Sequence, residues 1–189
     1  MNNLKALPVN LIMLSVADSS LVRDRWSMAS FITGDIFVRT PPSQTLRAWE
    51  PYWDCVSILF LFENSDIVDR NEELPEWRLH WISGIALLRT IGHVLAKVDS
   101  QYSLTHAAIV AGFWATLKAD RQSSDIFWNF IEEERNNILK TYTFGAKLSR
   151  SENGYFIEFA DGQDAFQLFR EALYWWRYHL ELLERELQK

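Results

Sequence analysis

The sequence DGQDAFQLFREALYWWRYHLELLERELQK, residues 161–189, decides the fold class. Its apolar residues recur at alternating steps of three and four, which is the spacing of one face of an α-helix. They are Phe166, Phe169, Leu173, Trp176, Leu180, Leu183 and Leu187. Asp161 or Asp164 can cap the first amides, and Arg185 suits the negative end of the helix dipole. A long amphipathic helix is therefore predicted at the end of the chain.

Residues 76–98 carry the second strong helical pattern, directly after Pro75, a residue favoured at helix starts. The main apolar stripe of this segment is Trp77, Trp81, Gly84, Leu88, Ile91, Leu95 and Val98. The rest of its surface is also apolar, and a helix that is apolar nearly all round normally lies at the centre of a fold. Gly84 and Gly92 each lower helix propensity by about 1 kcal/mol relative to alanine. We expect both to permit close approach of neighbouring helices.

Two further helices are predicted between these segments. One covers residues 124–142 and is expected to be capped by Ser123, Ser124 or Asp125. The other covers residues 104–119, LTHAAIVAGFWATLKA, and connects the second helix to the third. The order of helices is thus compatible with an all-α bundle.

Turn residues and proline mark the less regular parts of the chain. Asn153 and Gly154, followed by the β-prone residues 155–159, predict a small β-hairpin with a type I′ turn before the last helix. Residues 43–68 are compatible with either a helix or a strand, and Pro51 breaks any helix that starts at Ser43. The pattern leaves the type of this N-terminal element open.

The composition indicates a chain that folds around a large core. Hydrophobic residues make up 48% of the 189 positions, whereas chains too polar to bury a core stay disordered. The single Cys55 excludes an intramolecular disulfide framework and a cysteine-based zinc site. No secretory signal is evident near the N-terminus, and the longest apolar run, residues 55–62, is about a third of a membrane span. We therefore expect a cytoplasmic protein without a membrane contact.

The net charge of −6 limits how the chain could bind nucleic acid. Broad electrostatic binding to a phosphate backbone usually comes with a basic protein surface. A general nucleic-acid coat is therefore disfavoured, and any RNA contact would need a local basic patch.

Residues 127–142, FWNFIEEERNNILKTY, form the most informative motif. This stretch resembles the signature helix of HEPN domains, in which an Arg, often followed by a polar residue, precedes a catalytic His by four to six residues. Arg135 matches the Arg, Asn136 matches the polar residue, and Tyr142 stands where the His is expected. Residues 87–99, LLRTIGHVLAKVD, are similar to the first long helix of a HEPN-like group of bacterial and phage proteins. The resemblance covers roughly residues 76–187.

The resemblance implies a HEPN-like four-helix bundle over residues 71–189, with residues 1–70 as an N-terminal extension packed on it. It also implies a homodimer that cleaves RNA at the dimer interface without a metal or other cofactor. Toxin, defence and stress roles belong to the same family, and an antitoxin protein is a further partner that the toxin type would have.

The chemistry of RNA cleavage assigns roles to the motif. A base must face the ribose 2′-hydroxyl, and a cation must stabilise the phosphorane. Arg135 could be the cation, and Asn136 could orient the phosphate or the Arg. A phenol such as that of Tyr142 titrates near ~10 and is a poor base at neutral pH, although it can donate a hydrogen bond or act as an acid. The alternative is structural: Arg135 pairs with Glu132, and Tyr142 ends the helix against the core.

Arg89 and His93 lie four residues apart on the second helix. His93 could replace the missing catalytic His, which would place both residues around one pocket with Arg135 and Tyr142. The alternative is a hydrogen-bonded structural pair beside the bundle. His80 and His179 carry no metal-ligand spacing, and metal binding is not expected.

Tyr174, Trp175, Trp176, Arg177 and Tyr178 form an aromatic run within the last helix. Such a run can stack on RNA bases, but more often it fills a core or an oligomer interface. Trp175 falls outside the apolar stripe and is the candidate for a surface or dimer contact. Two rival interpretations of the whole chain remain: a catalytically inactive HEPN-like dimerisation or partner-binding module, and an unrelated all-α interaction protein.

Overall fold

The structure is a computed structural model that describes residue 36 and residues 44–64, 76–152 and 154–189. Most of the predicted extension over residues 1–70 lies outside these residues. The elements are α2 (Trp49–Asn64), α3 (Glu76–Lys97), the 3₁₀ turn η1 (Asp99–Gln101), α4 (Leu104–Ala119), the π-helical segment η2 (Ile126–Glu132), α5 (Glu133–Thr141), β1 (Lys147–Ser151), β2 (Gly154–Glu158) and α6 (Ala165–Leu187). The prediction of a mainly helical fold with a hairpin before the last helix is confirmed.

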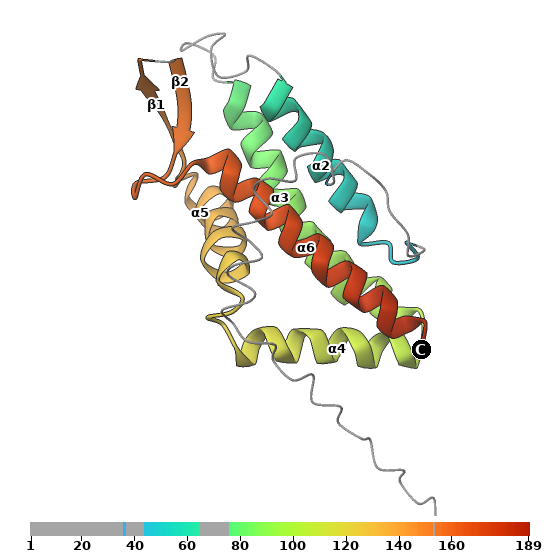
Figure 1. The fold of residues 1–189 in the computed structure, drawn as a ribbon. Coiled ribbons are helices and arrows are strands. Elements are labelled where there is room, and N and C mark those ends of the chain that lie inside the picture. The colour runs from blue at the N-terminus through green and yellow to red at the C-terminus, as the bar shows by residue number, and fades with distance from the viewer. Residues whose placement is uncertain (1–35, 37–43, 65–75, 153) are drawn as a thin grey trace, which may run out of the picture.

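Helices α2, α3 and α6 lie side by side, and η2 with α5 flanks α3 and α6 (Figure 1). Helix α4 crosses one end of this group, and the β-hairpin stands at the other end. Short connections link α3 to α4 and α4 to η2, so consecutive helices are also neighbours in space. The result is a helical bundle with one crossing helix.

Helix α3 is central because it packs against every other helix that the structure describes. The fully buried Trp81 touches the rings of Phe62, Phe130, Phe159 and Phe169, at centroid distances of 6.2, 6.0, 6.1 and 6.1 Å. Gly84 confirms the expected close approach, because an added Cβ would lie 2.7 Å from the Phe169 ring. The stretch Glu76–Gln101 also has the length and apolar composition of a membrane-spanning helix. A core helix shares that composition, and α3 packs within the bundle.

The element whose type the sequence left open is the helix α2. Pro51 is tolerated because it lies in the first turn, where its missing N–H has no helical acceptor. Two buried carboxylates hold the residues just before the helix. Glu184 accepts hydrogen bonds from Leu46 N (2.9 Å), Trp49 Nε1 (3.1 Å) and both donors of Thr45 (2.6 and 2.7 Å).

Asp99 in η1 is the second of these carboxylates, and we call Glu184 and Asp99 the anchor of α2. Its two carboxylate oxygens accept hydrogen bonds from Arg47 N (2.8 Å) and Ala48 N (3.1 Å). Burial raises the pKa of Asp99 even though these two amide donors favour its ionised form. Carboxylates at the start of a helix also face the positive end of its dipole. The N-terminal end of α2 is thus attached to α6 and η1.

The hairpin forms where it was predicted, but its turn lies one residue earlier. Ser151 pairs with Gly154, so Gly154 belongs to β2 and not to the turn. Asp164 is the N-cap of α6 and accepts a hydrogen bond from Gln167 N at 2.7 Å. Of the three predicted caps of the third helix, Asp125 stands at the start of η2, and its side chain makes no capping hydrogen bond.

Candidate functional site

The segment η2 replaces the first half of the third predicted helix with π-helical turns over Ile126–Glu132. A π-turn contains one more residue than an α-turn, and such turns are rare and often occur at functional sites. Phe127, Phe130 and Ile131 on this segment are buried against the bundle. Glu132, the last residue of η2, lies at the junction with α5, inside the motif of residues 127–142.

Glu132 connects three of the predicted site residues. Arg89 Nε on α3 donates a short hydrogen bond to Glu132 Oε2, and Asn136 Nδ2 contacts Glu132 Oε1 at 3.5 Å. Arg135 Nη1 in turn donates to Asn136 Oδ1 at 2.9 Å. All four side chains are half-buried. We call Arg89, Glu132, Arg135 and Asn136 the polar network.

The two arginines of the network differ in their charge balance. Arg89 is neutralised by Glu132, with its guanidinium also 5.7 Å from the centre of the Phe127 ring. Arg135 bonds to a neutral amide, and no carboxylate of the described residues lies within ion-pair distance of it. The predicted alternative, a pair between Arg135 and Glu132, is therefore wrong. The network holds Arg135 in place without cancelling its charge.

Tyr142 does not join the polar network. It ends α5 in a left-handed conformation with φ 54°, so its direction no longer follows from the helical spacing to Arg135. Its side chain is 63% exposed, which contradicts the prediction that it would pack against the core. Its ring contacts Phe144 at 5.3 Å and the guanidinium of Arg78 at 5.5 Å. Of the four residues predicted to surround one pocket, Arg89 and Arg135 therefore belong to the polar network and Tyr142 does not.

His93 is exposed and lies one turn beyond Arg89 on α3. Residues four apart are neighbours on a helix surface, so His93 extends the face of α3 that reaches the polar network. Arg89 hydrogen-bonds to Glu132 on η2. The predicted structural pair between Arg89 and His93 is therefore replaced by a contact between two helices.

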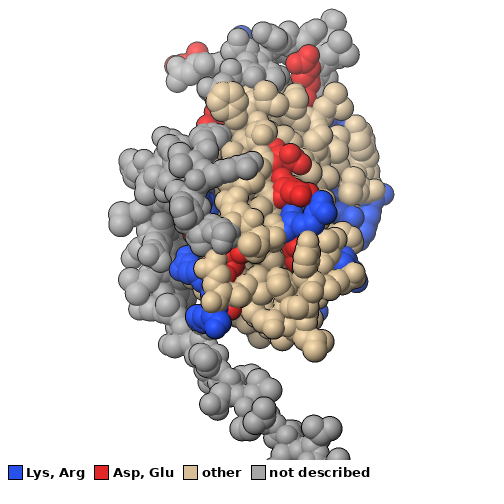
Figure 2. All heavy atoms as spheres, turned by 90° about the vertical axis from the view of Figure 1, so that its right-hand side faces the viewer, with Lys and Arg blue, Asp and Glu red and all other residues tan. Residues whose placement is uncertain are grey.

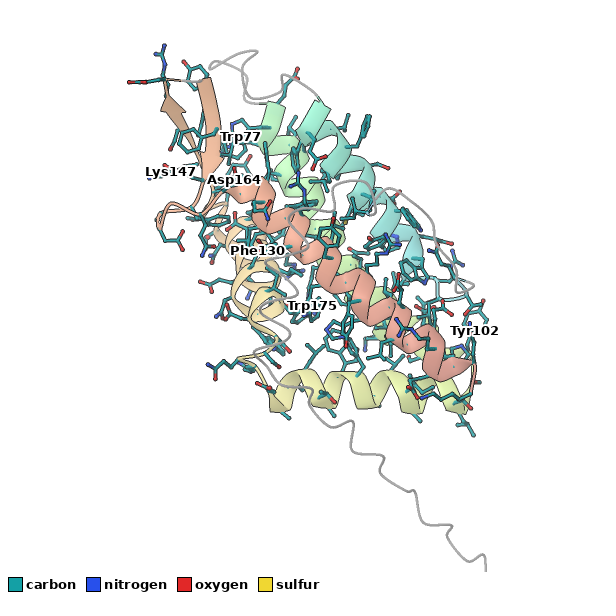
Figure 3. The ribbon with its side chains drawn as sticks, in the orientation of Figure 1. Trp77, Tyr102, Phe130, Lys147, Asp164 and Trp175 are labelled. Atoms are coloured by element: carbon teal, nitrogen blue, oxygen red, sulfur yellow. The ribbon has the colours of Figure 1, made fainter. Side chains whose placement is uncertain are left out.

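His179 lies in an aromatic cluster together with Trp175, whose predicted surface position is wrong. Trp175 is 3% exposed, and its ring lies 4.3 Å from that of His179 and 5.7 Å from that of Phe127. Figure 3 shows Trp175 among the side chains that fill the space between α6 and its neighbours. The Nδ1 atom of His179 is fully buried with no partner in the described residues, and burial lowers the pKa of His179 to about 4.

This pKa predicts a pH-dependent loss of stability. Because the folded-state pKa of His179 lies below the unfolded value near 6.5, its stabilising contribution is complete above pH 6.5 and is lost as pH falls toward about 4. Replacing His179 by Phe removes this pH-dependent contribution to the free energy of unfolding. In urea titrations from pH 7.5 to 4.5, the unfolding midpoint of wild type should fall more than that of His179→Phe. An equal fall in both proteins would contradict the prediction, and the exposed His93→Gln serves as the control.

A second polar group surrounds the anchor of α2. A hollow there is lined by Thr45, Asp99, Tyr102, His106, Glu184, Leu187 and Gln188. The carboxylates of Asp99 and Glu184 are already used by backbone amides, and His106 Nδ1 lies 2.8 Å from Ser103 Oγ. Across the described part of the chain, no group of three or more His, Cys, Asp or Glu side chains is placed to hold a metal ion.

Charge on the visible surface is mixed. On the face shown in Figure 2, acidic and basic side chains lie next to one another, and neither sign forms one broad patch. The six ion pairs within the described residues involve Arg47, Arg89, Arg170, Arg177, Arg185 and Lys189. Arg78, Arg135, Lys140 and Lys147 belong to none of these pairs. These four cations come from α3, from α5 and from the strand that follows α5.

The buried Glu134, the π-helical turn and the contacts of Glu132 with Arg89 and Asn136 are features that the sequence motif did not reveal. Glu134 is 3% exposed and accepts hydrogen bonds from Trp81 Nε1 (2.9 Å) and Gly145 N (3.0 Å). The spacing of four between Glu132 and Asn136 was the available signal for their contact. Comparison with family models, with curated proteins and with solved structures finds no match to this chain.

Proposed function

We propose that this chain is an RNA-directed, HEPN-like protein that binds an RNA phosphate through Arg135. The observation that carries the proposal is the charge of Arg135, which is oriented by Asn136 and is not paired with a described carboxylate. A planar guanidinium contacts two phosphate oxygens at once, and an oriented one loses little freedom on binding. The rare π-turn beside the network supports a functional role for this region.

Metal-independent cleavage at a homodimer cleft is the activity that the family resemblance adds to this proposal. Arg135 would stabilise the phosphorane, and a proton acceptor would have to face the 2′-hydroxyl. His93 suits this role better than Tyr142, because it is exposed on the face of α3 that reaches the network and is an imidazole. The proposal extends to a cytoplasmic toxin or defence role, with an antitoxin protein as partner.

The second candidate is a catalytically inactive HEPN-like module that binds RNA or a protein partner. The specific observation that favours it is the position of Tyr142, which stands where the motif expects His but contacts Phe144 and Arg78. A cleavage assay separates the two candidates, whereas a binding assay tests what they share.

The test measures binding and cleavage with one set of proteins. Arg135→Gln should weaken binding of a fluorescent single-stranded RNA by about 10- to 100-fold, since a hydrogen bond to a charged group contributes about 1.5–3 kcal/mol. Arg185→Gln removes an exposed cation from the other end of the molecule and should leave the affinity within about twofold. Fluorescence anisotropy in EDTA reports the affinity, and light scattering after gel filtration reports the dimer.

Cleavage is followed on the same RNA in EDTA. Cleavage that persists in EDTA and is lost in both Arg135→Gln and His93→Gln supports the nuclease. Binding without cleavage supports the inactive module. Wild-type protein that binds no RNA, or an Arg135→Gln variant that binds as well as wild type, would overturn the proposed phosphate site.

A further inference from the structure

Tyr142 occupies a backbone position that is unusual for its residue type. The residue after the last turn of a helix often adopts the left-handed conformation, but glycine is the usual occupant because a Cβ is strained there. Here Tyr142 adopts it with φ 54°, donating from its N–H to Ile138 O (3.0 Å), while Thr143 N donates to Asn137 O (3.2 Å). A bulky residue held in a strained position points to a role for its side chain.

The ring of Tyr142 is exposed and yet held in place. Phe144 meets it edge-on at 5.3 Å with an interplanar angle of 84°, and Phe144 itself packs on the buried Trp77 at 6.3 Å. The guanidinium of Arg78 lies over both rings, 4.4 Å from the centre of Phe144 and 5.5 Å from that of Tyr142. These contacts fix one side of the Tyr142 ring, and 63% of the residue remains open to solvent.

Of the cations without a described ion pair, one lies over this ring and two lie in the chain segments on either side of it. Arg78 lies over it, and Lys140 precedes it on the last turn of α5. Lys147 begins β1 at the base of the hairpin, on the same side of the molecule as Trp77 (Figure 3). Arg135 lies seven residues earlier on α5, which corresponds to about 10 Å along a helix. An RNA strand bound at Arg135 that runs along α5 toward its C-terminal end would bring a neighbouring nucleotide to Tyr142.

We propose that Tyr142 is a stacking platform for a base of single-stranded RNA whose phosphate Arg135 binds. This inference rests on the proposed function and gives it a substrate class, because only unpaired bases expose their faces to an aromatic ring. Arg78 contributes a cation–π contact to the ring and a charge toward the backbone. Tyr142 then has a binding role in place of the proton transfer that its position in the motif suggested.

Two substitutions at position 142 separate the ring from the backbone strain. Tyr142→Phe keeps the aromatic face, whereas Tyr142→Gly removes the ring and relieves the strained conformation, so the fold is kept. The probe is a single-stranded oligoribonucleotide that carries one 2-aminopurine, paired with the same oligonucleotide lacking that base. Tyr102→Ala is the matched control, because Tyr102 is 67% exposed and lies at the opposite end of the molecule (Figure 3).

Wild type and Tyr142→Phe should quench 2-aminopurine fluorescence and bind the intact RNA about tenfold more tightly than the abasic RNA. Tyr142→Gly should lose the quenching and bind both RNAs with the lower affinity, and Tyr102→Ala should behave as wild type. If Tyr142→Gly binds and quenches like wild type while Arg135→Gln binds weakly, the stacking role is overturned and the phosphate site stands. If wild type binds neither RNA, the proposed function and the stacking role are both overturned.

Discussion

Replacing Glu184 by alanine is expected to lower the free energy of unfolding by about 3 kcal/mol or more. The substitution leaves Leu46 N and Trp49 Nε1 without their acceptor in a buried environment, and each orphaned donor costs about 1–3 kcal/mol. Urea titration followed by circular dichroism measures the change. Because the lost contacts hold the start of α2 to α6, the amides at the start of α2 should also become less protected from hydrogen exchange.

Two further variants of α6 distinguish the loss of the buried hydrogen bonds of Glu184 from the general effect on stability of removing a carboxylate. Glu186→Ala removes a neighbouring carboxylate that pairs with Lys189 near the surface, and it should change stability by less than about 1 kcal/mol. Glu184→Gln keeps one acceptor oxygen and should fall between wild type and Glu184→Ala. Equal losses in Glu184→Ala and Glu186→Ala would contradict the role assigned to the anchor.

Replacing Trp81 by alanine is expected to lower the free energy of unfolding by about 3–5 kcal/mol. Trp81 is fully buried and contacts rings from α2, η2, α6 and the segment after β2, so its removal leaves a cavity between four parts of the chain. It also leaves the buried carboxylate of Glu134 without one of its two donors. Chemical unfolding measures this loss of free energy. The more conservative Trp81→Phe should lose less stability than Trp81→Ala.

Leu79→Ala is the control on the same helix. Leu79 is 67% exposed, and its truncation should change stability by less than about 0.5 kcal/mol. A Trp81→Ala variant as stable as Leu79→Ala would show that α3 is not the central helix of the fold.

The long helices were predictable because each carries a complete apolar stripe. The predicted bounds of 104–119 match α4, and those of 76–98 differ from α3 by one residue. For α2 the pattern was ambiguous, because apolar residues cover much of its surface and its start is held by side chains distant in sequence. The periodicity of a sequence indicates which face of a helix is buried, but it does not indicate which distant side chains bind the end of that helix.

The contacts of the candidate site were predictable only where both residues lie on the same helix. Arg135 and Asn136 are neighbours in the motif, and the structure joins them directly. The pairing of Arg89 with Glu132 required the packing of α3 against η2, and the π-turn that places Glu132 has no signature in the residue spacing. Tyr142 left the expected face because the helix ends there in a left-handed turn, at a residue type that rarely adopts one.

The anchor of α2 also has a consequence for the order of events during synthesis. Thr45 and Glu184 are 139 residues apart, so a ribosome adding about 5–20 residues per second makes the acceptor about 7–28 seconds after the donors. Asp99 follows Arg47 by 52 residues, so among the described contacts it can hold the start of α2 before Glu184 is made. During synthesis the apolar helix α2 therefore exists before its contact with α6 can form, and α6 completes the bundle after every other described element has been made.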